Sequence, residues 1–150
     1  MKVFKDLNEM GENVGQELGV TEWQTITQEQ INDFAEVTGD LQWIHTKPLK
    51  AKFGPFGTTI AHGFLVLSLA PKMLEDTYVV KSAKMGVNYG LDRVRFMSPT
   101  FSGGYVRALI SLVDAEINAE SVKYKMSITF EQKGQEKPVC VAEFLAVGYE

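Results

Sequence analysis

The hydrophobic pattern of the chain changes character near its middle. Residues 59–73 are apolar nearly all round, in the run TIAHGFLVLSLAPKM, whereas the residues after them alternate between apolar and polar side chains. An all-round apolar helix is typical of one enclosed by other structure, and strict alternation is typical of a half-buried strand. The pattern therefore predicts one central helix followed by a sheet.

Four long strands are expected in the second half. They span about 84–97, 105–117, 121–133 and 136–148, with turns at Gly103-Gly104, Asn118-Ala119 and Gly134-Gln135. Turns this short join antiparallel strands. A weaker strand signal covers 15–26. The sequence thus predicts an α+β fold in one domain, 1–150, with an antiparallel sheet curved around the central helix.

A sheet of this kind exposes unpaired edges. Such edges are a liability that oligomers bury by pairing strands between subunits. We therefore expect a homodimer in which two sheets join edge to edge and each sheet wraps its own helix.

The first helix is predicted from its end signals. Thr27 and Gln30 have the spacing of a capping box, and Gly39 is the type of residue that ends a helix. One face carries Ile31, Phe34, Ala35 and Thr38. Asp40 would then lie at the negative end of the helix dipole, which is expected to raise its basicity. After it, Pro48 and the run GPFG predict a largely irregular loop over 41–59.

Composition narrows the possible partners. The 150 residues are 45% hydrophobic and 23% charged with a net charge of −4, and no run of Lys and Arg favours nucleic acid or an anionic membrane. The N-terminus carries acids where a signal peptide needs an apolar core, and the longest apolar stretch includes His62 and Ser68. We expect a cytoplasmic protein without membrane insertion. Cys140, the single cysteine, is expected to be a buried thiol in a reducing compartment.

The chemistry-bearing residues concentrate in 38–64, which holds one acid, two histidines and four glycines. Asp40 and His45 are the best candidates for proton transfer. The Gly63 N–H, at a helix start, is a candidate hydrogen-bond donor to an anion. Taken alone, a Gly-Asp pair is more often a turn and a lone histidine more often structural. GPFGTT lacks the Lys-Ser/Thr of a phosphate loop. The two histidines form no metal-ligand set of recognised spacing, so neither a metal nor a cofactor is expected.

The motifs GDLQWIH at 39–45 and GTTIAHGFLVLSL at 57–69, with Ala51 between them, resemble the MaoC-like dehydratases or (R)-specific enoyl-CoA hydratases, and among these the nodulation-protein-N-like branch. The resemblance covers the chain from about Trp23 onward. It implies a hot-dog fold, homodimeric as a rule, and reversible hydration of trans-2-enoyl thioesters of coenzyme A or acyl carrier protein to (R)-3-hydroxyacyl thioesters. The chain departs from the family pattern at Gln42-Trp43, where many members have Asn-Pro, and at Lys47, where they have Asp.

The resemblance also assigns roles to residues. The family's acid, histidine and oxyanion glycine match Asp40, His45 and Gly63. Gln42 can offer an amide to the site, and His62 is expected to bond a backbone carbonyl and shape the loop. The rings of Phe53, Phe56 and Phe64 are expected either in the core or along an acyl channel. Two alternatives stay open: a hot-dog acyl-thioesterase, and a non-catalytic protein that binds acyl thioesters.

Overall fold

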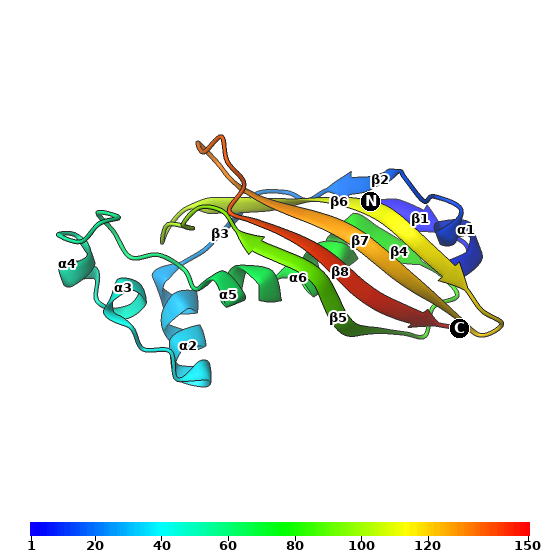
Figure 1. Ribbon diagram of the computed structural model, residues 1–150, viewed down its shortest axis with the longest axis horizontal. Coiled ribbons are helices and arrows are strands. Elements are labelled where there is room, and N and C mark those ends of the chain that lie inside the picture. The colour runs from blue at the N-terminus through cyan, green and yellow to red at the C-terminus, as the bar shows by residue number, and fades with distance from the viewer.

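The computed structural model covers residues 1–150 and contains the predicted antiparallel sheet. Its strands run in the order β2-β6-β7-β8-β5, and β3 also pairs with β6. The long strands are β5 (Met85–Phe96), β6 (Tyr105–Ile117), β7 (Ser121–Gln132) and β8 (Cys140–Tyr149), and the short ones are β2 (Glu17–Val20) and β3 (Gln24–Thr25). Figure 1 shows this sheet curving over two helices, α5 (Gly63–Ser68) and α6 (Ala70–Thr77).

The central helix differs from the expected one in its bounds and in its continuity. Residues before Gly63 are extended: Ile60 forms a β-bridge with Phe101, and the Ala61 N–H donates to the Thr100 carbonyl at 2.7 Å. The helix is then interrupted at Leu69. Proline lacks an N–H and its ring clashes with the carbonyl four residues earlier, so Pro71 accounts for the break. The prediction of one helix over 59–73 was therefore wrong at its start and in its middle.

The core lies between these helices and the concave face of the sheet. Along β6, β7 and β8 buried positions alternate with half-buried ones, as the sequence pattern predicted. The inward side chains form one cluster with the helices, and its most deeply buried members are Val66, Ala70, Met73, Val106, Ala108, Ile110, Leu112, Met126, Ile128, Phe130, Cys140 and Ala142. Burial raises the pKa of the Cys140 thiol to about 11, which makes it the inert core residue predicted.

Two of the predicted sheet elements need correction. The strand expected at 136–148 begins only at Cys140, because the connection through Gly134 and Pro138 is longer than a tight turn. The segment 15–26 is divided into β2 and β3, both paired with β6. At the N-terminus, β1 (Lys2–Phe4) pairs in parallel with β4 (Tyr78–Val80), and α1 (Leu7–Gly11) lies between β1 and β2 in the chain.

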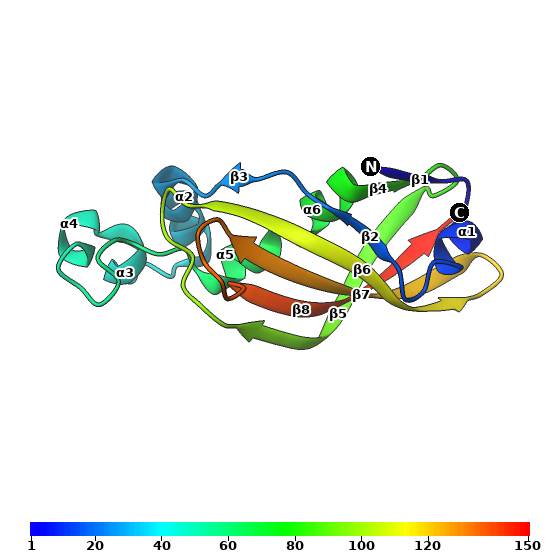
Figure 2. The ribbon, with the colours of Figure 1, turned by 90° about the horizontal axis from the view of Figure 1, so that it is seen from above.

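Three helices project beyond one end of the sheet, as Figures 1 and 2 both show. Helix α2 (Gln28–Thr38) begins with the predicted capping box, in which Thr27 and Gln30 bond each other's backbone, and ends at Gly39 with a φ of 79°. Thr38, expected on its buried face, is exposed. The loop expected over 41–59 instead contains two helical turns, α3 (Trp43–Thr46) and α4 (Pro48–Ala51). No helix combines the length and hydropathy needed to cross a membrane.

Candidate active site

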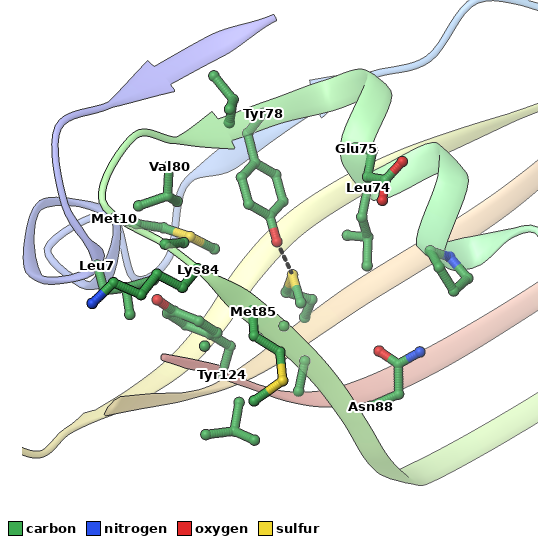
Figure 3. A pocket seen from close by; sticks show the side chains of 18 residues that line it. Leu7, Met10, Leu74, Glu75, Tyr78, Val80, Lys84, Met85, Asn88 and Tyr124 are labelled. Atoms are coloured by element: carbon green, nitrogen blue, oxygen red, sulfur yellow. Dashed lines mark hydrogen bonds between the residues drawn. The ribbon is translucent and has the colours of Figure 1, made fainter. Parts of the chain in front are cut away.

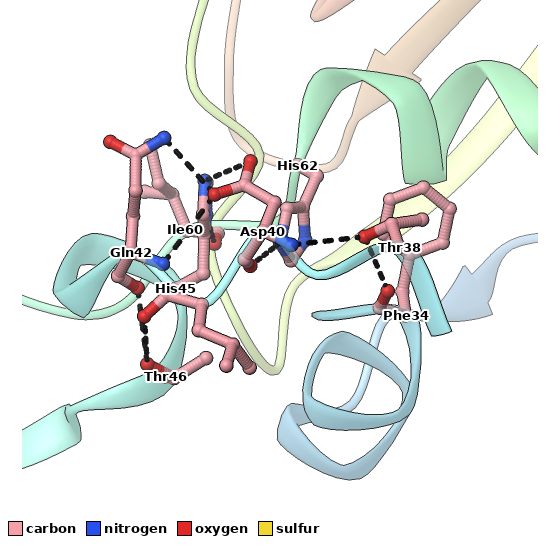
Figure 4. Close-up of polar contacts among 9 residues, drawn as sticks. Phe34, Thr38, Asp40, Gln42, His45, Thr46, Ile60 and His62 are labelled. Carbon is pink, nitrogen blue, oxygen red and sulfur yellow. Dashed lines mark hydrogen bonds and ion pairs between the residues drawn. The ribbon is translucent and has the colours of Figure 1, made fainter. Parts of the chain in front are cut away.

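Asp40 and His45 meet at the junction between α2 and α3. Gly39 ends α2 in a left-handed conformation that glycine adopts without strain, and Asp40 follows directly. His45 lies in the single turn of α3, where its ring is buried. The Nε2 atom of His45 is 3.9 Å from the Oδ2 atom of Asp40, and Figure 4 shows the two side chains facing each other.

The backbone carbonyl of Ile60 fixes the tautomer of His45. The Nδ1 atom of the ring lies 2.7 Å from this oxygen, which only accepts hydrogen bonds, so Nδ1 carries the proton. In the neutral ring Nε2 is then unprotonated and presents its lone pair toward Asp40. Burial lowers the pKa of His45, which keeps the ring neutral at pH 7.

Asp40 is held as a carboxylate by Gln42. The Gln42 side-chain amide donates to Oδ1 at 3.1 Å and its backbone N–H donates to the same oxygen at 3.4 Å. These bonds, above all that of the side-chain amide, lower the pKa of Asp40. The predicted rise in basicity was wrong, because direct hydrogen bonds to the charged form outweigh the dipole of α2. Gln42, one of the two adjacent residues at which this chain departs from the MaoC-like pattern, thus contributes directly to the site.

His62 contacts both Asp40 and His45. Its Nε2–H donates to the Asp40 carbonyl at 3.0 Å, and its ring stacks on that of His45 with centroids 3.8 Å apart. The ring of Phe34 packs against His62 with a centroid distance of 4.9 Å. The Nδ1 atom of His62 is buried and has no hydrogen-bond partner.

Gly63 opens helix α5 beside a cavity of about 320 Å³ that His45 and Phe96 also line. Because it is the first residue of the helix, its N–H has no acceptor within the helix. A Cβ atom at this position would lie 2.9 Å from the Phe96 ring, so only glycine fits without a shift. Phe64 points outward, is 70% exposed and packs edge to face on Phe96 at 5.8 Å.

Three groups that complete this arrangement could not be recognised from the sequence alone. Gln28, at the start of α2, donates to the His45 carbonyl at 2.7 Å and accepts from the Thr59 hydroxyl, so it ties the two sides of the loop together. The Ile60 carbonyl and the Phe96 ring reach the site from segments distant in the chain. Lys47 lies exposed between α3 and α4, outside these contacts.

The fold also assembles a possible metal-ligand set that spacing did not reveal. One oxygen or nitrogen atom from each of Asp40, His45 and His62 lies within 4.8 Å of the others. Each histidine uses one ring nitrogen on a backbone carbonyl, which leaves Nε2 of His45 and Nδ1 of His62 as the free ligand atoms. Spacing along the sequence does not reveal this set, because only the fold brings His62 beside Asp40 and His45.

The curved sheet around a central helix and the acid–histidine pair in the projecting segment define a class of protein. A profile of the MaoC like domain family matches residues 9–133, and the chain belongs to this family. It is 46% identical over 144 residues to the 3-hydroxyacyl-thioester dehydratase Z of Mycobacterium tuberculosis strain H37Rv, with 95% of each chain covered. It is 40% identical over 144 residues to nodulation protein N of Rhizobium leguminosarum bv. viciae, covering 94% of this chain and 89% of that protein.

Solved structures confirm the hot-dog fold. The monoamine oxidase regulatory protein of Archaeoglobus fulgius superposes with a TM-score of 0.79 at 25% identity, covering 99% of this chain and 97% of that one. The (R)-hydratase of A. caviae involved in PHA biosynthesis superposes with a TM-score of 0.72 at 20% identity, covering 89% and 94%.

Proposed function

We propose that this protein adds water to trans-2-enoyl thioesters to give (R)-3-hydroxyacyl thioesters, and catalyses the reverse dehydration. The observation that carries the proposal is the pair formed by the Asp40 carboxylate and the unprotonated Nε2 of His45, 3.9 Å apart. The relative named 3-hydroxyacyl-thioester dehydratase supports the same reaction. The substrate is an acyl thioester of coenzyme A or acyl carrier protein.

The paired acceptors explain how water is activated. A water molecule has two O–H donors, and Asp40 and His45 each offer it one acceptor, so the pair orients the water with an oxygen lone pair toward C3 of the substrate. As the C3–O bond forms, the proton leaves for one of these two groups and is returned to C2. No other group has to enter the proton transfer.

Gly63 is the proposed donor to the thioester oxygen. Negative charge develops on this oxygen while water adds, and a fixed N–H stabilises it. The N–H of Gly63 has no helical acceptor and borders the cavity that His45 also lines. The Phe96 ring fills the space that a side chain at position 63 would occupy, so this packing requires a glycine here.

We further propose that the protein acts as a homodimer paired along β5. This strand is one edge of the sheet, and all its residues except Gly90 and Val94 are exposed. Phe96, its last residue, is 47% exposed, and Phe64 and Met97 beside it are 70% and 52% exposed. Pairing with a second copy would satisfy the free strand edge and bury this apolar surface next to the active site.

Hydration of crotonyl-CoA tests the reaction. Asp40→Asn and His45→Gln are each expected to lower turnover at least about 10²-fold while the fold is kept. Asp33→Asn, an exposed carboxylate on α2, is the matched control and should retain activity. Release of free thiol from saturated acyl-CoA would instead identify a thioesterase. An inactive wild type that still binds enoyl-CoA would identify the non-catalytic alternative.

A further inference from the structure

A second cavity lies at the opposite end of the central helix from Asp40 and His45. It measures about 390 Å³ and is lined mainly by apolar side chains from α1, α6, β4, β5, β7 and β8. It shares no lining residue with the catalytic cavity. Along the central helices, Val66 lines the catalytic cavity and Pro71 the second one, and the buried residues Leu67 and Ala70 lie between them in the chain.

Two tyrosine hydroxyls line this cavity without a strong hydrogen-bond partner. Tyr124 is 4% exposed and its hydroxyl is buried with no partner at all. The Tyr78 hydroxyl contacts only the Sδ atom of Met126 at 3.8 Å, and sulfur is a weak acceptor. Figure 3 shows both rings in the cavity wall, with the Tyr78–Met126 contact dashed. Buried hydroxyls are normally paired, so two such groups in one apolar cavity point to a ligand that carries a hydrogen-bond acceptor.

The pairing of β5 proposed above places this cavity beside an active site. Met85, Gly86 and Asn88 line the second cavity at the start of β5, while Phe96, at its end, lines the catalytic cavity. In an antiparallel pair of two copies of β5, the start of one strand lies against the end of the other. The apolar cavity of each protomer therefore adjoins the catalytic cavity of its partner.

We propose that this cavity receives the distal part of the acyl chain bound in the partner's active site, and that Tyr78 and Tyr124 select chains bearing a hydroxyl or ketone oxygen there. The inference rests on the proposed hydratase function and on the β5 dimer. The apolar lining accommodates the hydrocarbon, and the phenol hydroxyls donate to the oxygen. Tyr78 and Tyr124 are thus specificity-determining residues remote from the reacting atoms.

Matched substrates test the selection. Trans-2-enoyl-CoAs of equal length, with a hydroxyl or ketone placed at successive distal carbons or absent, are compared by kcat/KM. At its best position the oxygen should raise kcat/KM about 2- to 10-fold, the range of one net hydrogen bond. The preference is the ratio of kcat/KM with and without the distal oxygen. Tyr124→Phe removes only the unpaired hydroxyl, so the variant should fold and lose this ratio. Tyr78→Phe should reduce the ratio. Tyr105→Phe, an exposed tyrosine outside the cavity, should keep it.

Hybrid dimers test which protomer supplies the tyrosines. A dimer of one Asp40→Asn protomer and one Tyr124→Phe protomer keeps a single competent active site, whose neighbouring cavity has Tyr124, so the wild-type ratio is expected. If one protomer carries both substitutions beside a wild-type protomer, the ratio should be lost. The opposite pair of results would place cavity and active site in one chain and overturn the partner assignment. A wild type that hydrates crotonyl-CoA but ignores the distal oxygen at every position would overturn the selection itself, whereas no hydration of any enoyl-CoA would instead remove the proposed function.

Discussion

The Nδ1 atom of His45 donates to the carbonyl oxygen of Ile60 at 2.7 Å, and this bond leaves Nε2 of His45 as a free acceptor facing Asp40. The carbonyl cannot donate, so the opposite tautomer would lose this bond inside a buried site. The form of the pair in which Nε2 can accept a proton is thus set by a backbone group of the segment that leads into the central helix.

The acid limb of the pH profile should report His45. Burial lowers its pKa from the ordinary value of 6.5, so the ring stays neutral as pH falls to 6.5. The value of kcat/KM should therefore stay constant over this range. Protonation below pH 6.5 should then lower activity. The same depressed pKa contributes stability that is present above about pH 6.5 and is lost as pH falls toward the folded-state pKa, because the unfolded chain binds the proton first. His45→Gln should lose this part of the pH dependence of Tm. An acid limb of wild type at or above pH 6.5 would contradict the assignment.

The role of the Gly63 N–H can be isolated only after space is made for a side chain. Because a Cβ atom there meets the Phe96 ring at 2.9 Å, a simple Gly63→Pro change would mix a clash with the loss of the donor. The comparison is therefore made in a Phe96→Ala background. His62 has a φ of −60° and a ψ of 138°, which suit the residue before a proline, and the first helical position tolerates proline.

In that background, Gly63→Pro should turn over about 10²- to 10³-fold more slowly than Gly63→Ala, since the two differ chiefly in the N–H. Turnover is measured at saturating enoyl-CoA, with dimer content checked for both variants. Equal rates in two folded dimers would remove Gly63 from the mechanism.

His62 should act on the reaction through His45. His62→Phe keeps a ring against His45 and Phe34 but loses the bond to the Asp40 carbonyl, and such supporting contacts typically contribute about 10- to 100-fold. The electrostatic influence of His62 also helps to lower the pKa of His45, so its removal should shift the acid limb to higher pH. A variant with reduced turnover and an unmoved acid limb would show that His62 only supports the fold. A loss as deep as that of Asp40→Asn would place His62 among the reacting groups.

The parts of this fold that local pattern determines could be predicted from sequence. Alternation fixes which face of β6, β7 and β8 is buried, and the capping box and Gly39 fix both ends of α2. Asp40 and His45 could be paired because only five positions separate them. The pKa of Asp40 depends on the orientation of the Gln42 side chain two residues away, which residue types alone do not determine. The tautomer of His45 and the steric demand at Gly63 depend on groups that tertiary contacts bring in. The break at Leu69 shows that the apolar pattern alone does not indicate where Pro71 interrupts the helix.

Metal removal should leave the enzyme active. The proposed proton transfer uses the lone pair on Nε2 of His45 and the Asp40 carboxylate, both free to hold water. We expect full crotonyl-CoA hydration after dialysis against a chelator. Because Asp40, His45 and His62 can together offer ligands to an ion, added Zn²⁺ should inhibit by occupying the same lone pairs. Loss of activity on chelation, restored by one particular ion, would require a different mechanism.

Leu91 tests the dimer, because it lies at the middle of β5 and is 40% exposed. In an antiparallel pair of β5 strands the two copies of Leu91 lie near the twofold axis. Leu91→Asp would place like charges close together there, which costs several kcal/mol at an interface and should weaken dimerisation at least about tenfold. Val113→Asp on β6, where the wild-type residue is 44% exposed, introduces the same charge away from β5 and should leave the dimer intact.

Sedimentation across a concentration series measures the dissociation constant, and hydration of a long-chain enoyl-CoA at the same concentrations measures function. If the partner completes the acyl site, Leu91→Asp should lose long-chain activity as it dissociates. A wild type that sediments as a stable monomer at micromolar concentration, or a Leu91→Asp variant that dimerises as wild type does, would contradict β5 pairing.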